Sequence, residues 1–155
     1  MTQLSERLRR ALESDCTADI SQIIVEKNPK DLEQLRSLLT LDTSVDTRYR
    51  SRAIHILGRW GDPQSVAKLH EILPQLDEAG RISAVSALGR LDTKKAIAVV
   101  LDSVNDSSPQ VRETAVTALA KINTQETKTK LREISERDPE QWIRAKASKY
   151  LSKAQ

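Results

Sequence analysis

An internal repeat constrains this chain more than any other feature of its sequence. Three segments align without a gap at a spacing of 31 residues: RAIHILGRWGD from Arg52, SAVSALGRLDT from Ser83 and TAVTALAKINT from Thr114. A fourth segment, IRAKASKYLSK from Ile143, aligns with VRETAVTALAK from Val111 at a spacing of 32 residues. Self-similarity at a period of this length is typical of solenoid proteins, in which each repeat is one supersecondary unit stacked on its neighbours.

Each repeat contains two amphipathic segments, which predicts a pair of helices. After each of the first three copies, a second segment begins at Pro63, Thr93 or Thr124 and carries apolar residues three and four positions apart. The Gly-Asp, Leu-Asp and Ile-Asn junctions between the paired segments supply N-caps for the second helices. The chain has only 4 glycines and 5 prolines, which are few for a β protein of this length. The sequence therefore predicts an all-α solenoid of helical hairpins.

The length of 155 residues suits a single domain, which we expect to span residues 1–155. Terminal units of a repeat protein are commonly atypical, because they cover the ends of the stack. We expect a capping helix within 1–17, a degenerate repeat at 18–44 with helices over 18–27 and 30–42, full repeats at 45–76, 77–107 and 108–138, and half a repeat at 139–155.

Charge and cysteine content narrow the classes of function. The net charge is only +3, and acidic residues are spread along the whole chain, so composition alone does not indicate nucleic-acid binding. Cys16 is the single cysteine, which excludes an intrachain disulfide and favours a reducing compartment. Met1 leads into a charged stretch, and no apolar run approaches the length of a membrane span. We expect a cytoplasmic protein without membrane contact.

Two stretches, LGRWGDPQSVAKLHEIL from Leu57 and SPQVRETAVTALAKI from Ser108, resemble the HEAT-like repeats first named from phycobilin lyases. The resemblance covers nearly the whole chain, from Ala18 to Lys153. It implies a right-handed superhelix with the first helix of each repeat on the convex side and the second helix on the concave side. It implies no chemistry, since such repeats occur in lyase subunits and also in scaffolds and adaptors.

The sequence contains no recognisable catalytic motif. Its glycines form neither a dinucleotide fingerprint nor a Walker loop, and neither HExxH nor CxxC occurs. His55 and His70 have no carboxylate and nucleophile nearby at a recognisable spacing, and we interpret His55 as a solvated surface residue. Cys16 follows the first helix without an adjacent basic cluster that would activate its thiol. We therefore expect no catalytic residue, no metal and no cofactor.

One row of equivalent residues, the ladder arginines, lies in the first turn of each first helix. A cation there opposes the helix dipole, so it needs a compensating partner. Aspartates lie just upstream in the loops, which predicts a structural inter-repeat ladder of Arg–Asp hydrogen bonds, with ligand binding as the alternative. The ladder arginines are Arg50, Arg81, Arg112 and Arg144, and the aspartates are Asp46, Asp77, Asp106 and Asp138.

A second row, the basic row, lies in the last turn of the first helices. Cations in this position complement the helix dipole and the exposed carbonyls, which favours a structural role. Four cations at stacking distance along one edge are also able to bind phosphates, so an anion-binding edge is the alternative. The basic row consists of Arg59, Arg90, Lys121 and Lys153.

A third row, the acidic row, lies on the second helices and consists of Glu71, Asp102 and Glu133. These residues lie opposite apolar positions, so we expect them to be exposed and unpaired on the concave face. Small neighbouring side chains predict an open groove. Such a groove would repel a phosphate backbone and attract a basic or amphipathic peptide. This row favours a protein partner over nucleic acid, with a solvated polar face as the alternative.

Trp142 is an aromatic residue at an outward-facing position. Its equivalents in the other repeats are Arg48, Ala79 and Gln110. Aromatic residues at such places often carry binding energy. Two interpretations remain open: the indole folds over the end of the stack as a lid, or it docks into a partner or a second copy of the chain.

The combined features predict a non-catalytic adaptor or scaffold that binds a protein through its concave surface and C-terminal end. We expect a monomer or a weak homodimer formed through that end. The first alternative is a nucleic-acid or anion-binding protein that uses the basic row. The second is an accessory subunit of the phycobilin-lyase type, which the resemblance implies.

Overall fold

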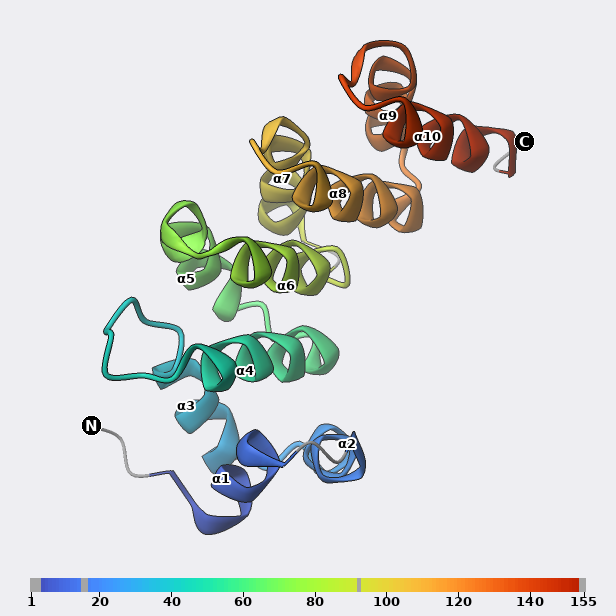
Figure 1. Ribbon diagram of the computed structural model, residues 1–155. Coiled ribbons are helices and arrows are strands. Elements are labelled where there is room, and N and C mark those ends of the chain that lie inside the picture. Colours follow the sequence, from blue (N-terminus) through green and yellow to red (C-terminus); the bar gives the residue numbers. More distant parts are fainter. Residues whose placement is uncertain (1–3, 15–16, 92, 154–155) are drawn as a thin grey trace.

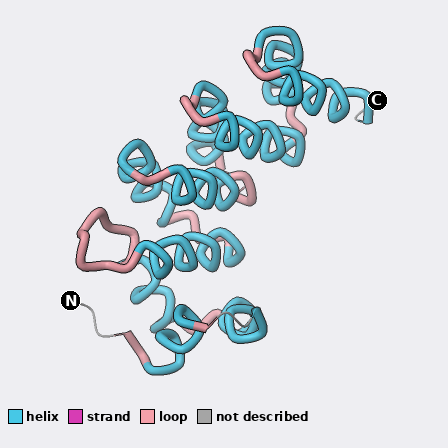
Figure 2. The backbone as a smooth tube through the Cα atoms, viewed as in Figure 1, coloured by secondary structure: helices cyan, strands magenta, loops and turns pink. Residues whose placement is uncertain are grey.

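The computed structural model describes residues 4–14, 17–91 and 93–153, and within these ranges the only regular elements are helices (Figures 1 and 2). The predicted all-α solenoid is confirmed. The elements are α1 Glu6–Glu13, α2 Thr17–Glu26, α3 Pro29–Ser37, α4 Thr47–Trp60, α5 Ser65–Ile72, the 3₁₀ helix η1 Leu73–Gln75, α6 Glu78–Leu88, α7 Lys94–Asp102, the 3₁₀ helix η2 Ser103–Asn105, α8 Pro109–Ile122, α9 Gln125–Arg137 and α10 Gln141–Lys153.

The helices form a stack of hairpins that runs from α1 at one end to α10 at the other (Figure 1). The pairs α4 and α5, α6 and α7, and α8 and α9 follow one another, and α10 packs on both α8 and α9. The same helix positions face the core in every repeat. At one of them the buried residues are Ala53, Ala84, Ala115 and Ala147, all fully buried. The spacing of small and apolar residues therefore fixes which side of each first helix faces inward.

Consecutive first helices pack closely because small residues meet at their contact. A β-carbon added at Gly58 would lie 2.5 Å from the β-carbon of Ala87, and one at Gly89 would overlap Ala118 in the same way. The second helices contact each other much less along the stack. We call the solvent-exposed side of α4, α6, α8 and α10 the first-helix face, and that of α5, α7 and α9 the second-helix face.

Capping residues define where the helices begin. At the Gly-Asp junction the prediction is confirmed, since Asp62 accepts from the N–H of Ser65 at the start of α5 at 3.1 Å, but at the other two junctions the cap lies one position later. Thr93 and Thr124, which follow the predicted capping dipeptides, accept hydrogen bonds from the backbone N–H groups of Ala96 and Thr127. Asn123 has a positive φ of 56° and ends α8, so the residue expected as an N-cap closes the preceding helix instead.

The N-terminal part of the stack is tied to α4 by polar contacts. The Trp60 indole donates to the carbonyl of Ile24 at 3.0 Å, and Arg36 pairs with the buried Asp62. The helix predicted over 30–42 ends at Ser37. The helix closes with a tight last turn, in which the N–H of Leu39 donates to the carbonyl of Arg36 at 3.0 Å.

None of the helices in the described ranges is long and apolar enough to cross a membrane.

Candidate functional site

The ladder arginines Arg81 and Arg112 make paired hydrogen bonds across the stack. Arg81 donates through Nε and Nη2 to Asp106 at 2.9 and 3.1 Å. Arg112 donates in the same way to Asp138 at 3.0 and 3.2 Å. Each arginine therefore reaches the aspartate in the loop that follows the second helix of its own repeat and leads into the next first helix.

These contacts stabilise the charged forms of Arg81, Arg112 and Asp138. Hydrogen bonds to Asp106 and Asp138 raise the pKa values of Arg81 and Arg112. Burial favours the neutral form of Asp138, but bonds from Arg112 and from the N–H of Glu140 outweigh it and lower the pKa of that carboxyl below its ordinary value. A bidentate pair of this kind fixes the spacing and rotation of adjacent repeats.

The predicted ladder is incomplete at both ends. Arg50 donates to the carbonyl of Asp42 at 3.2 Å, but its buried Nε has no partner in the described part of the chain. The position equivalent to Asp106 is Gln75, which offers no carboxylate. Asp46 and Asp77 instead accept from the backbone N–H groups at the starts of α4 and α6. The predicted ladder is therefore wrong for Asp46 and Asp77, which cap helices and do not bond to ladder arginines.

Arg144, the last ladder arginine, also lacks a carboxylate partner among the described residues. Its Nη1 donates to the carbonyls of Asp138 and Pro139, the second at 3.0 Å. The guanidinium edge formed by Nε and Nη2 has no partner there, and neither atom is a buried unsatisfied group. This edge is therefore open to solvent.

The basic row lies on the first-helix face, and all four of its side chains are exposed. None of them makes an ion pair with another residue in the described ranges. Partial desolvation of the His55 ring, and then the positive charges of Arg90 and Arg59, lower the pKa of that histidine. The lowered pKa of His55 is consistent with the two nearby arginines, although Glu113 lies close to Arg90 and Lys121 on the same face.

The acidic row on the second-helix face differs from the prediction. All three side chains are exposed, but Glu71 pairs with Lys68 and Glu133 pairs with Lys130, both at 2.9 Å. The hydrogen bond and charge of Lys130 lower the pKa of Glu133. The expectation of unpaired acids is wrong for two of the three, because each has a lysine one helical turn earlier.

A cleft does open on the second-helix face, between α7 and α9. Its volume is about 460 Å³, and Asp102 and Thr129 from opposite helices contribute to its walls. Lys130 pairs with Glu133 in this cleft, but Asp102 and Glu126 also line it, so acidic side chains outnumber basic ones there. The cleft therefore keeps part of the negative character that the sequence predicted.

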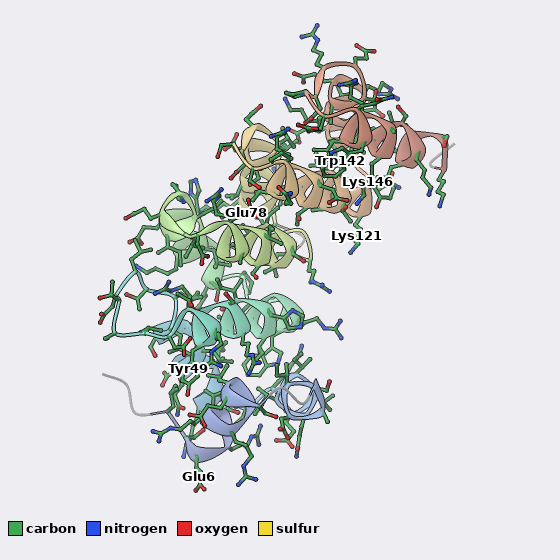
Figure 3. All side chains as sticks on the ribbon, in the orientation of Figure 1. Glu6, Tyr49, Glu78, Lys121, Trp142 and Lys146 are labelled. Carbon is green, nitrogen blue, oxygen red and sulfur yellow. The ribbon has the colours of Figure 1, made fainter. Side chains whose placement is uncertain are left out.

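Trp142 is exposed by 43% and lies on α10 at the first-helix face (Figure 3). It lines a cleft of about 410 Å³ that we call the Trp142 cleft, whose other walls are Ala145, Lys146, Lys149, Tyr150 and Lys153. Lys146 also pairs with Glu113 of α8, whereas Lys149 and Lys153 make no ion pair within the described ranges. The indole is therefore open to solvent and does not close over the core as a lid.

Three lysines of α10 lie beside Trp142. Lys146, Lys149 and Lys153 follow it at intervals that bring them to one side of a helix, a pattern that was readable as a stripe. Cys16 lies outside the described residues. Within the described ranges, no group of three or more His, Cys, Asp and Glu side chains is placed to hold a metal ion.

The fold defines a helical repeat protein, and its candidate binding features, the basic row, the acidic row and Trp142, are exposed. The sequence profile of HEAT repeats matches residues 32–105 and 66–152, and the chain belongs to the HEAT repeat family. No curated protein matches the sequence.

Among solved structures, the chain is similar to the complex of CpcE and CpcF of phycocyanin lyase from Nostoc sp. PCC7120. The TM-score is 0.63 and the identity 21%, over 87% of this chain and 99% of the other. At this identity the similarity concerns the fold.

Proposed function

We propose that this protein is a non-catalytic repeat adaptor that binds an acidic protein partner through its first-helix face, with the Trp142 cleft as the anchor site. The observation that carries the proposal is the exposed indole of Trp142 beside Lys146, Lys149 and Lys153. An aromatic side chain at the centre of a contact supplies much of the binding energy. Surrounding lysines attract and orient an acidic partner.

The basic row extends this surface along the stack. Arg59, Arg90 and Lys121 continue the positive face from α10 toward α4, and the lowered pKa of His55 agrees with that charge. The acidic row is partly neutralised by Lys68 and Lys130. An acidic partner on the first-helix face therefore replaces the basic or amphipathic peptide that the sequence favoured for the second helices.

The solved structure to which this chain is similar is a complex of two proteins, CpcE and CpcF. This supports a role in protein assembly for the present chain as well. It equally supports an accessory subunit of the phycobilin-lyase type. That alternative predicts co-purification with a pigment-bearing protein, visible as absorbance outside the ultraviolet in the purified complex.

Crosslinking from native lysate followed by mass spectrometry tests the proposal. A chain with Trp142→Ala and Lys149→Glu should lose the crosslinks that the wild-type chain forms at α10. The matched control neutralises the acidic row with Glu71→Gln, Asp102→Asn and Glu133→Gln, and should keep them. If the control loses the crosslinks and the α10 variant keeps them, the second-helix face is the contact surface and the proposal fails.

Nucleic acid is the second candidate partner, because the basic row carries four exposed cations that make no ion pair within the described residues. If all four contact phosphates of duplex DNA, the logarithm of affinity should fall with the logarithm of salt concentration with a slope of about −3.6. A short DNA duplex and a glutamate-rich peptide of equal charge distinguish the candidates. Preference for the peptide, together with dependence on Trp142, supports the adaptor, whereas preference for DNA supports the alternative.

A further inference from the structure

A cleft of about 180 Å³ opens on the first-helix face between α6 and α8, and we call it the Arg90 cleft after one of its lining residues. Gly89 and Ala118 line it at the place where the two helices meet, since a β-carbon added at Gly89 would lie 2.4 Å from that of Ala118. Because these contact residues carry almost no side chain, the longer side chains around them leave a hollow. The packing of the stack itself therefore forms the cleft.

Positive side chains from three parts of the stack converge on the Arg90 cleft. Arg90 follows the end of α6, Lys121 lies in the last turn of α8, and Lys146 lies on α10 (Figure 3). Glu113 is the one acid among the lining residues, and it pairs with Lys146. Arg90 and Lys121 are exposed and make no ion pair within the described ranges. Three cations and one acid give the lining side chains a net charge of +2.

The hydroxyl groups that line the cleft differ in what they offer an anion. Thr114 and Thr117 already donate to carbonyls of their own helix, those of Gln110 and Glu113, at 2.9 and 3.0 Å. Ser86 lies on α6 at the position equivalent to Thr117, and its half-buried side chain makes no hydrogen bond with any described residue. The cleft therefore holds one free hydroxyl donor beside two cations that no acid neutralises.

We propose that the Arg90 cleft binds the phosphate group of a phosphorylated serine or threonine in the partner protein. A phosphate monoester carries a charge of about −1.5 to −2 at neutral pH and three strong acceptor oxygens. This charge matches the cleft, and the oxygens match the donors Arg90, Lys121 and Ser86, two of which form charge-assisted bonds. A phosphodiester of nucleic acid carries a single charge and has two of its oxygens substituted, so it matches the cleft less well.

The Arg90 cleft adjoins the surface proposed for the partner. Lys146 lines both the Arg90 cleft and the Trp142 cleft, so one bound segment is able to contact both. The inference rests on the proposed binding of an acidic protein to the first-helix face, and it identifies the acidic group as a phosphate. Trp142 does not line the Arg90 cleft, which makes the two contacts separable by substitution.

The probe is the phosphopeptide acetyl-Gly-pSer-Gly-amide, titrated into the full ¹⁵N-labelled chain and followed by NMR. The amide resonances of Gly89 and Ala118 should shift and saturate. The pKa of His55 is lowered by burial and then by the charge of Arg90, so phosphate bound beside that arginine should raise it. The ring resonances of His70, on the second-helix face, should stay in place.

Substitutions in the cleft should change the affinity for this phosphopeptide in a defined order. Lys121→Gln should weaken binding about tenfold, because it removes a charge-assisted bond, and Ser86→Ala should weaken it about fivefold. Glu113→Gln should strengthen binding, since it removes the acid that repels the phosphate. The matched control is Arg59→Gln, an exposed member of the basic row outside the cleft, which should change the affinity less than about twofold.

The inference is overturned if Arg59→Gln weakens binding as much as Lys121→Gln, because the charge of the whole face and not the cleft then holds the anion. It is also overturned if acetyl-Gly-Glu-Gly-amide or a thymidine dinucleotide with one phosphodiester binds as tightly as the phosphopeptide, or if the cleft resonances do not respond. Trp142→Ala should leave phosphopeptide binding unchanged. The adaptor proposal fails separately, if the crosslinks at α10 survive Trp142→Ala with Lys149→Glu.

Discussion

Replacing Arg112 by alanine should test the packing of the stack most sharply. The arginine is 8% exposed and makes two bonds to Asp138, with further bonds to the carbonyls of Asp106 and Ser107. Its removal leaves the buried carboxylate of Asp138 with the N–H of Glu140 as its remaining partner. Breaking a buried ion pair costs about 3 to 5 kcal/mol, and one retained hydrogen bond reduces this to about 2 to 4 kcal/mol of unfolding free energy.

Chemical denaturation of Arg112→Ala, Asp138→Ala and the double variant forms a cycle that isolates the pair. The double variant should be less destabilised than the sum of the single variants, because no buried charge remains unpaired. The m-value should stay constant, so that the shift in midpoint reports stability. An unchanged midpoint for Arg112→Ala with an intact m-value would refute the structural role of this pair.

Three further predictions follow from the contacts in the stack. Gly89→Ala should destabilise the fold by about 1 to 3 kcal/mol through overlap with Ala118, measured by denaturant titration, whereas Ser152→Ala at the equivalent exposed position should have little effect. Asp138→Asn should lower stability at neutral pH. Because the folded pKa of Asp138 is lowered, its contribution is present above the unfolded value of about 3.9 and is lost as pH falls through the folded pKa, so wild-type and variant curves should converge in acid. Neutralising the whole acidic row should leave the thermal midpoint essentially unchanged, since these side chains are exposed; a clear drop would show that the row is structural.

The sequence was sufficient to predict the repeat fold because stacking repeats the same inward positions. Ala84 and Ala115 are fully buried at the predicted phase, and the period alone identifies them. Helix caps were less predictable. Asparagine and threonine are both favoured at the N-cap, so residue type alone did not distinguish Asn123 from Thr124. Apolar spacing also extended α3 past Ser37, where the structure ends that helix.

Surface rows were harder to interpret, since periodicity shows which residues are equivalent but not which neighbours they contact. The sequence predicted an inter-repeat ladder of Arg–Asp bonds without pairing individual residues, and the structure shows that Arg81 bonds to Asp106, just before the next first helix. The pairing of Glu133 with Lys130 was available from their spacing and changes the charge of that face. The row of equivalents placed Trp142 at an outward-facing position, but it did not distinguish an indole folded over the end of the stack from one open to solvent.

The environment of the Trp142 indole tests the central proposal most directly. In a Trp60→Phe chain, Trp142 is the only tryptophan, and its acrylamide quenching reports how open the ring is. Circular dichroism first checks that this variant keeps its helices, because Trp60 donates a hydrogen bond to Ile24. The account predicts strong quenching in the free chain, protection when the partner crosslinked at α10 is added, and no protection from that partner once Lys149→Glu is introduced. Weak quenching in the free chain, or strong quenching that the partner leaves unchanged, would contradict it.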